Sequence, residues 1–167
     1  MSRGFVKEGD QEEAPLVTPR ASIPAGAINY VTPNGLIELK QEQNLLVEER
    51  KILIEQSDED NRLQINYLTA KLYLLDERIN SARIVDLSNQ TQHEILFGAT
   101  ITLFKKEENC TCQYQIVGMD EANVSQNKVS FLSPIAKVLL NKKAGDVIIL
   151  QTPTGKRTMK VEAIEYL

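Results

Sequence analysis

Apolar residues follow a helical period in the first half of the chain and a period of two in the second. Leu39, Leu46 and Leu53 recur every seven residues, with polar or charged residues at most positions between them. The next segment has apolar spacings of 3, 4, 3, 4 and 3, through Ile65, Leu68, Leu72, Leu75, Ile79 and Ala82. Both patterns are typical of helices that pack in coiled coils. The sequence therefore predicts two helices that each bury one face.

An acidic stretch, Ser57-Asp58-Glu59-Asp60-Asn61, separates the two helical patterns. Each pattern covers about three heptads, which is marginal for an isolated helix in water. Because each helix needs a partner for its apolar face, we predict a short antiparallel hairpin over residues 33–82, with the acidic turn at its tip. Thr32 suits an N-cap and Pro33 suits the first helical position, so the hairpin is expected to begin there.

After residue 95 apolar and polar residues alternate, which is typical of half-buried strands. Strands are predicted over residues 99–104, 112–117, 128–131, 147–150 and 157–164. Ser133-Pro134 again pairs a capping residue with a proline, so a short helix is predicted over residues 134–140. The fold class predicted is α+β: an N-terminal antiparallel coiled-coil hairpin followed by an antiparallel β domain with one short helix.

These patterns divide the chain into an extended tail (1–31), a coiled-coil hairpin (32–84) and a C-terminal domain (85–167). The tail contains Pro15, Pro19 and Pro24 and has little periodicity. A tail that wraps around the body and a tail that docks on a partner are both open interpretations.

The composition narrows the class of protein. The 167 residues carry a net charge of −4, so bulk charge does not favour binding to nucleic acid. There is no apolar run of about 18 residues and the N-terminus has no apolar signal region, so neither a membrane span nor secretion is expected. The two cysteines and the single histidine favour a reduced, cytoplasmic protein without a histidine-based catalytic site.

A set of short motifs follows one order through residues 80–167. They are Asn80–Asp86, Phe97–Thr100, Tyr114–Gly118, Asp120–Ala122, Ser133–Ala136, Gly145-Asp146, Thr152-Pro153 with Gly155, and Ile164–Leu167. In this order they resemble the hinge and the C-terminal domain of the bacterial Gre transcript-cleavage factors (GreA/GreB). Thr32 and Gly35 also fit the start of that family's first helix, so the resemblance covers about residues 30–167.

The resemblance implies an FKBP-like C-terminal domain that docks at the rim of the RNA polymerase secondary channel, while the coiled coil enters it. It implies a transcription elongation factor that is not itself an enzyme and contacts transcript RNA only indirectly. Docking would involve Ser133, Pro134, Ile135 and Ala136. The acids expected at the tip are Asp58, Glu59 and Asp60. In the family, two tip acids help hold a second Mg²⁺ in the polymerase active site for cleavage of backtracked RNA, so no cofactor belonging to this chain is expected.

The tip departs from the family's Gly-Asp-x-x-Glu-Asn pattern, because residues 55–62 contain no glycine and no Asp-x-x-Glu. Each arm is also roughly one heptad shorter, which removes about 10 Å of reach. Two mechanisms therefore stay open, a cleavage factor and a secondary-channel regulator that does not cleave. A purely structural alternative has Ser57 or Asp58 cap the second helix. A binding or scaffold protein with another partner is the alternative from a different class; otherwise a monomer is expected.

Overall fold

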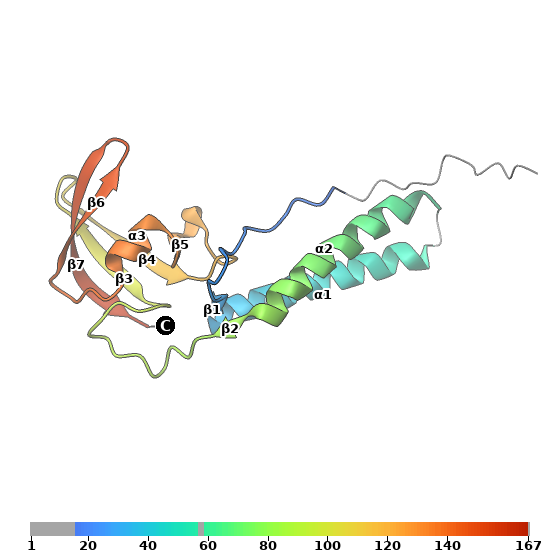
Figure 1. Cartoon of the computed structure of the whole chain (residues 1–167), viewed down its shortest axis with the longest axis horizontal. Helices are drawn as coiled ribbons and strands as arrows, with labels where there is room; N and C mark the ends of the chain where they lie inside the picture. The colour runs from blue at the N-terminus through green and yellow to red at the C-terminus, as the bar shows by residue number, and fades with distance from the viewer. Residues whose placement is uncertain (1–15, 57–58, 167) are drawn as a thin grey trace, which may run out of the picture.

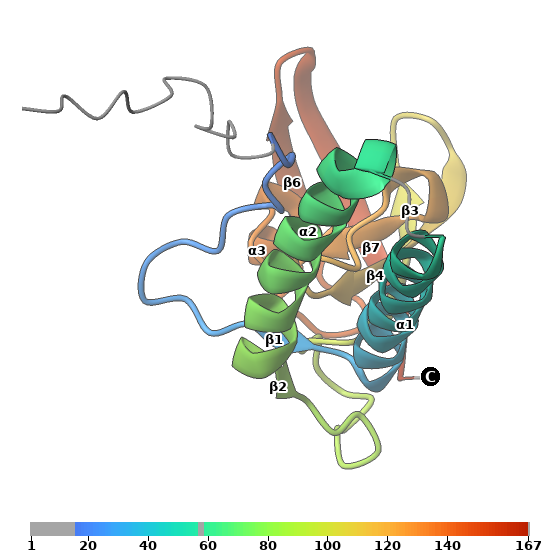
Figure 2. The ribbon, with the colours of Figure 1, turned by 90° about the vertical axis from the view of Figure 1, so that its right-hand side faces the viewer.

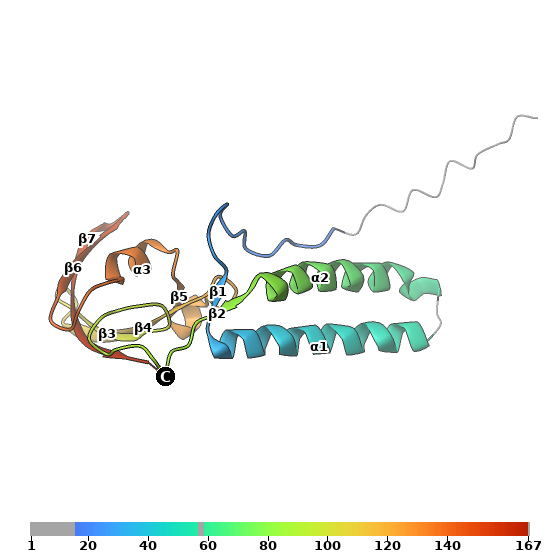
Figure 3. The ribbon, with the colours of Figure 1, turned by 60° about the horizontal axis from the view of Figure 1, so that its bottom comes forward.

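The computed structural model describes residues 16–56 and 59–166. A helical hairpin projects from a curled sheet, and the two parts meet beside strands β1 and β2 (Figure 1). Residues 59–61 of the turn between the two helices lie at the end of the hairpin farthest from the sheet (Figure 3). This arrangement confirms the predicted α+β fold with an N-terminal hairpin.

The hairpin consists of α1 (Pro33–Glu55), the 3₁₀ turn η1 (Glu59–Asn61) and α2 (Arg62–Ser81). The Thr32 hydroxyl accepts a hydrogen bond of 3.0 Å from the Gly35 N–H, so the predicted N-cap is present. The apolar positions predicted from the heptad pattern face each other across the two helices. The buried members of this cluster are Val31, Leu39, Leu46, Leu68, Leu72 and Leu75. At 1.5 Å per residue, the 23 residues of α1 span about 35 Å.

A two-stranded parallel ladder closes the base of the hairpin. Strand β1 (Tyr30–Val31) pairs with β2 (Arg83–Ile84), directly before α1 and after α2. The sequence pattern did not predict it, because two residues are too few to display a strand period. The ladder places residues that enter and leave the hairpin side by side.

The larger sheet has five strands in the order β5-β4-β3-β7-β6. Their bounds are β3 Thr100–Lys105, β4 Cys110–Val117, β5 Lys128–Ser130, β6 Val147–Thr152 and β7 Gly155–Glu165. The β4–β5 pair is parallel and the other pairs are antiparallel, so the sheet is mixed where the sequence predicted an antiparallel one. The reason is that residues 118–127, with the turn η2 (Val124–Gln126), carry the chain back as far as Gln115, so that β5 runs alongside the last three residues of β4 in the same direction.

Helix α3 (Pro134–Leu139) packs on one face of this sheet and completes its core (Figure 1). Ala136 and Leu139 belong to a buried cluster that combines alternate strand residues with Ile95 and Ala99, which precede β3. That cluster contains Ile95, Ala99, Ile101, Leu103, Ile116, Ile148, Met159, Val161 and Ile164. The Tyr166 hydroxyl ties the preceding linker to this core, because it donates to the Glu94 carbonyl (2.6 Å) and accepts from the Leu96 N–H (2.9 Å).

Viewed along the hairpin, the two helices lie in front of the sheet and the N-terminal segment passes beside α2 (Figure 2). None of the helices within residues 16–56 and 59–166 combines the length and the hydropathy that crossing a membrane requires.

The hairpin core predicts one stability effect. Leu75 is fully buried between the helices, whereas Leu45 on the outer face of α1 is 73% exposed. We expect Leu75→Ala to lower the free energy of unfolding by about 2–5 kcal/mol, because it leaves a cavity in the core. The matched Leu45→Ala variant is expected to change it by less than about 0.5 kcal/mol. Urea unfolding monitored by helical circular dichroism measures both, and equal effects would contradict the assigned core.

Candidate functional site

The acidic turn is described in part. Glu59 and Asp60 belong to η1 and lie at the distal end of the hairpin, and Asp60 is exposed. Asp58, the third acid predicted at the tip, lies outside the described residues. The structure therefore places the backbone of two predicted acids at the tip.

The start of α2 differs from the capping alternative. Asn61 occupies the N-cap position and its side chain makes no capping hydrogen bond. Its amide instead donates to the Gln56 side chain at 3.2 Å, across the turn. Helix α2 itself begins at Arg62. Ser57 and Asp58, the residues of the capping alternative, lie outside the described residues.

The four residues predicted to dock form the start of α3, but they have different surroundings. The Ser133 hydroxyl caps the helix by accepting from the Ala136 N–H at 3.2 Å. Ala136 is fully buried in the core, and Ile135 packs partly against it. Pro134 is the exposed member of the group. Of the four side chains, Pro134 is therefore best placed to contact a partner.

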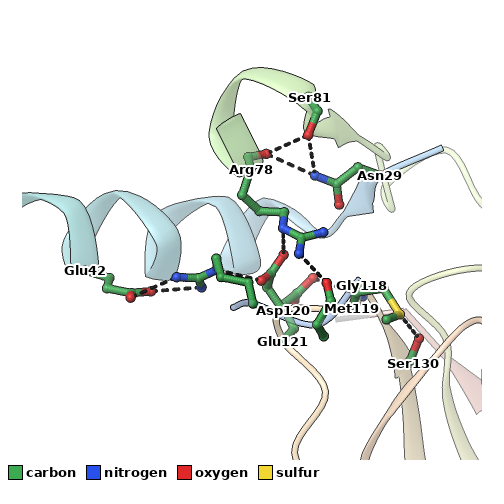
Figure 4. Close-up of polar contacts among 11 residues, drawn as sticks. Asn29, Glu42, Arg78, Ser81, Gly118, Met119, Asp120, Glu121 and Ser130 are labelled. Atoms are coloured by element: carbon green, nitrogen blue, oxygen red, sulfur yellow. Dashed lines mark hydrogen bonds and ion pairs between the residues drawn. The ribbon is translucent and has the colours of Figure 1, made fainter. Parts of the chain in front are cut away.

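A buried carboxylate joins the two parts of the molecule. Glu121, in the loop after β4, is only 6% exposed and lies at the N-terminus of α1 (Figure 4). It accepts hydrogen bonds from the Thr32 N–H (3.0 Å), the Thr32 hydroxyl and the Gly118 N–H (3.2 Å). A negative charge at a helix N-terminus is also favoured by the helix dipole. Glu121 thus caps a helix that belongs to the other half of the molecule.

Two glycines make room for this contact. A Cβ atom on Gly35 would overlap the Cγ, Cδ and Oε2 atoms of Glu121. A Cβ atom on Gly118 would lie 2.5 Å from the Tyr30 carbonyl oxygen. Glycine at both positions lets the backbone of each part approach the other, which explains a glycine in the first turn of a helix.

Three aromatic rings pack beside the capped helix. Tyr30 of β1 contacts Phe97 and Phe131, with ring centroids 5.8 Å apart in both pairs. Phe97 and Phe131 lie 5.7 Å apart in an edge-to-face arrangement. Because Phe131 precedes the start of α3 closely, this cluster connects the base of the hairpin to the segment predicted to dock.

The hinge after α2 contains a compact polar turn. Asp86 accepts hydrogen bonds from the Ser88 hydroxyl (2.6 Å), the Ser88 N–H (2.9 Å) and the Asn89 amide (2.6 Å). These bonds, the one from the Ser88 hydroxyl most of all, lower the pKa of Asp86 below its usual value. The turn is therefore favoured above the unfolded pKa of Asp86 and weakens as the pH falls through the lowered one.

Within the described part of the chain, no three His, Cys, Asp or Glu side chains cluster closely enough to hold a metal ion. Cys110 and Cys112 are free thiols at the start of β4, and burial raises the pKa of Cys112. Carboxylate oxygens are the ligands that Mg²⁺ prefers, so the acids of the tip have suitable donor chemistry for a metal held mainly by another protein.

Sequence reasoning missed the contacts that join the two parts. In the sequence, Asp120 and Glu121 stand out only as part of a motif of the resemblance, and no local pattern marks Arg78 as a partner of Asp120. Gly35 was the available signal, because glycine in the first turn of a helix indicates a close approach.

Fold and site together define a two-part protein in which an acid-tipped helical hairpin projects from a small α+β domain. The family described as "Transcription elongation factor, GreA/GreB, C-term" matches residues 90–166. The transcription elongation factor GreA of Xylella fastidiosa is 35% identical over 107 residues, which cover 64% of this chain and 68% of the relative. The chain therefore belongs to the GreA/GreB family of transcription elongation factors.

A second relative and two solved structures were also compared with this chain. GreA of Francisella philomiragia is 37% identical over 93 residues, and the match spans 58% of that protein's length. Among solved structures, the GreA factor homolog 1 (Gfh1) of Thermus thermophilus is 25% identical with a TM-score of 0.40, covering 83% of this chain and 99% of that one. A GreA/GreB factor from Nitrosomonas europaea is 15% identical with a TM-score of 0.43, covering 82% and 98%. Both TM-scores are low, so family membership depends on the sequence matches.

The contact between Gly35 and Glu121 predicts that a glycine-to-alanine substitution in a helix lowers stability, the opposite of its usual effect. Alanine normally stabilises a helix relative to glycine by about 1 kcal/mol. Here we expect Gly35→Ala to destabilise the protein by about 1–3 kcal/mol, because the new methyl group overlaps the buried carboxylate. Thermal and urea unfolding measure the effect.

The double variant tests the cause. In a Glu121→Ala background the space is empty, so Gly35→Ala is expected to be neutral or stabilising relative to Glu121→Ala alone. Asn34→Ala, at the exposed neighbouring position, is the control for the first turn. If Gly35→Ala costs the same in both backgrounds, the overlap with Glu121 is not the cause.

Proposed function

We propose that this protein binds RNA polymerase at the secondary channel and modulates transcript elongation, with the hairpin inside the channel. The observation that carries the proposal is the position of η1, with Glu59 and Asp60, at the far end of a hairpin that projects from a GreA/GreB-family domain (Figure 1). A protein that acts on RNA polymerase is expected in the cytoplasm.

The proposed chemistry belongs to the polymerase, so the chain itself is not an enzyme. Asp58, Glu59 and Asp60 are the candidate tip acids that would assist cleavage of backtracked RNA. Their carboxylates fit Mg²⁺, which takes oxygen ligands at about 2.1 Å and keeps few protein ligands at phosphate-processing sites. The hairpin supplies reach, and the domain supplies attachment; contact with the transcript would be indirect.

The docking segment provides the first test. We expect Pro134→Ala to weaken binding to core RNA polymerase by about tenfold, which corresponds to about 1.4 kcal/mol, since Pro134 is the exposed residue of the group. Pro153→Ala, in the exposed turn between β6 and β7, is the matched control and is expected to bind as the wild type does. Biolayer interferometry measures the affinities.

The outcomes of this experiment test the docking assignment and the binding to RNA polymerase separately. Equal binding by Pro134→Ala and the wild type would contradict the docking assignment alone. A wild-type protein without affinity, under conditions in which a cleavage factor binds, would contradict the proposal as a whole.

The tip provides the second test. In a backtracked elongation complex, the Asp58→Ala/Glu59→Ala/Asp60→Ala variant is expected to leave the RNA uncut while binding polymerase normally, because it lacks the carboxylates but keeps the docking surface. Glu48→Ala, on the exposed side of α1, removes an acid away from the tip and is the control. If wild type and triple variant leave equal amounts of uncut RNA, the cleavage role fails.

Two other functions have specific support. The shorter arms and altered tip favour a channel regulator that does not cleave, which is the interpretation left by a failed cleavage test. Exposed apolar side chains on the hairpin favour a scaffold with another protein partner or a second copy. They are Ile37, Leu45, Ile52, Ile54 and Leu63. Sedimentation that depends on protein concentration would favour this alternative, whereas we expect a monomer.

A further inference from the structure

One arginine of the N-terminal segment, Arg20, contacts both the hairpin and the C-terminal domain. The Arg20 guanidinium donates two parallel hydrogen bonds to the Glu42 carboxylate of α1, at 2.9 and 3.0 Å. Its Nε atom donates to Asp120, in the loop after β4, at 3.0 Å. Bidentate pairing of this kind fixes the plane of the guanidinium as well as its distance. Arg20 thus connects the hairpin directly to the C-terminal domain.

Asp120 is the centre of a neutral group of four charges. Its side chain is 5% exposed, and the Arg78 guanidinium of α2 lies 3.2 Å from Oδ2 (Figure 4). Arg20 contacts the other oxygen, Oδ1. Among the described residues, no donor makes a hydrogen bond of good geometry to Oδ2, so the nearby charge of Arg78 compensates this atom. The hydrogen bond to Glu42, more than the one to Asp120, raises the pKa of Arg20 above its ordinary value.

The same segment is held at other points. Arg78 donates a hydrogen bond to the Ala21 carbonyl oxygen, and its own side chain is 10% exposed. Val17 lines a shallow groove with Ala70 and Leu74 of α2. The segment runs beside α2 in both side views (Figures 1 and 3). These contacts keep Arg20 between its two acidic partners.

Because of the position of Glu42 along α1, Arg20 holds the helix at a second point beyond its first turn. Glu121 holds the first turn of α1, and a helix held at one end can pivot about it. Glu42 lies ten residues after Thr32, about 15 Å along the axis, so Arg20 provides a second anchor well beyond the first. Two further ion pairs cross the joint among the described residues. Arg78 pairs with Asp120 near the C-terminal end of α2, at the base of the hairpin. Lys128 pairs with Glu38 at 3.5 Å, four residues closer to the start of α1 than Glu42. Two separated anchors determine a direction.

We propose that Arg20 is a positioning residue, which locks the direction of the hairpin relative to the domain that carries the docking segment. This inference rests on the proposed function for its consequence at the polymerase. An arm of about 35 Å that tilts by about 10° displaces its tip by about 6 Å, far more than metal coordination tolerates. The N-terminal segment therefore acts as part of the joint.

The direct test uses the full-length chain without polymerase. In a Cys110→Ser/Cys112→Ser background, spin labels at Glu48→Cys on α1 and Glu162→Cys on β7 occupy exposed positions on the two parts. Electron–electron double resonance measures the distance distribution between them. Arg20→Gln is expected to broaden and shift this distribution, and Glu42→Gln is expected to do the same.

Control variants distinguish a change in the direction of the hairpin from a general loss of protein stability. Arg157→Gln removes an arginine of β7 that pairs at 3.4 Å with Glu108, in the turn between β3 and β4, away from the joint, so the distance distribution of this variant is expected to match the parent's. The Arg20→Gln/Glu42→Gln variant is expected to be no broader than either single variant, because both remove the same bridge. Arg20→Lys serves if Arg20→Gln does not fold, since lysine keeps the charge but lacks the fork that binds both acids. An unchanged distribution in the folded Arg20 and Glu42 variants would overturn the proposal.

A second measurement distinguishes this inference from the proposed function. If the wild type stimulates cleavage, Arg20→Gln should bind polymerase with unchanged affinity and cleave about 10²-fold more slowly, because the tip is misplaced. Loss of affinity together with cleavage would contradict a positioning role. If the wild type does not bind polymerase, the proposed function fails, while the distance distributions still decide whether Arg20 locks the joint.

Discussion

The contact of the Glu121 carboxylate with the first turn of α1 is the interaction on which the arrangement of the two parts depends. A carboxylate buried this deeply is tolerated because three donors, two of them from Thr32, compensate the loss of water. It also faces the positive end of the α1 dipole. Gly35 and Gly118 follow from it, because any side chain there would push the two parts away from each other.

The contacts around this carboxylate all hold the base of the hairpin against the C-terminal domain. The β1–β2 ladder closes the hairpin base, the ring of Tyr30 packs on two rings of the domain, and Arg20 adds an anchor farther along α1. The hairpin itself needs no such help, because its own apolar faces hold it together. Its direction is a separate matter, since a long arm converts a small rotation at its base into a large displacement at its tip.

This separation gives the molecule three regions with different physical demands. For the proposed function, the tip needs exposed acids, and the start of α3 needs an exposed residue on a rigid core, a position that Pro134 occupies beside the buried Ala136. The joint between them needs buried, directional polar contacts, because apolar packing alone permits sliding. The joint explains how one part can position the other.

Local patterns in the sequence determined the hairpin, its tip, the start of α1 at Thr32-Pro33, the strands of the sheet and the capped start of α3. Each depends on neighbours a few residues apart, so spacing and capping chemistry are sufficient to predict it. Tertiary structure alone decided the parallel pairing of β5, the capping of α1 by Glu121 and the bridge made by Arg20. Thr32 and Glu121 are 89 residues apart in the sequence, and Arg20 and Asp120 are 100 apart. No local period records such a pairing, because the partner of a buried charge is chosen only when the two parts of the chain come together.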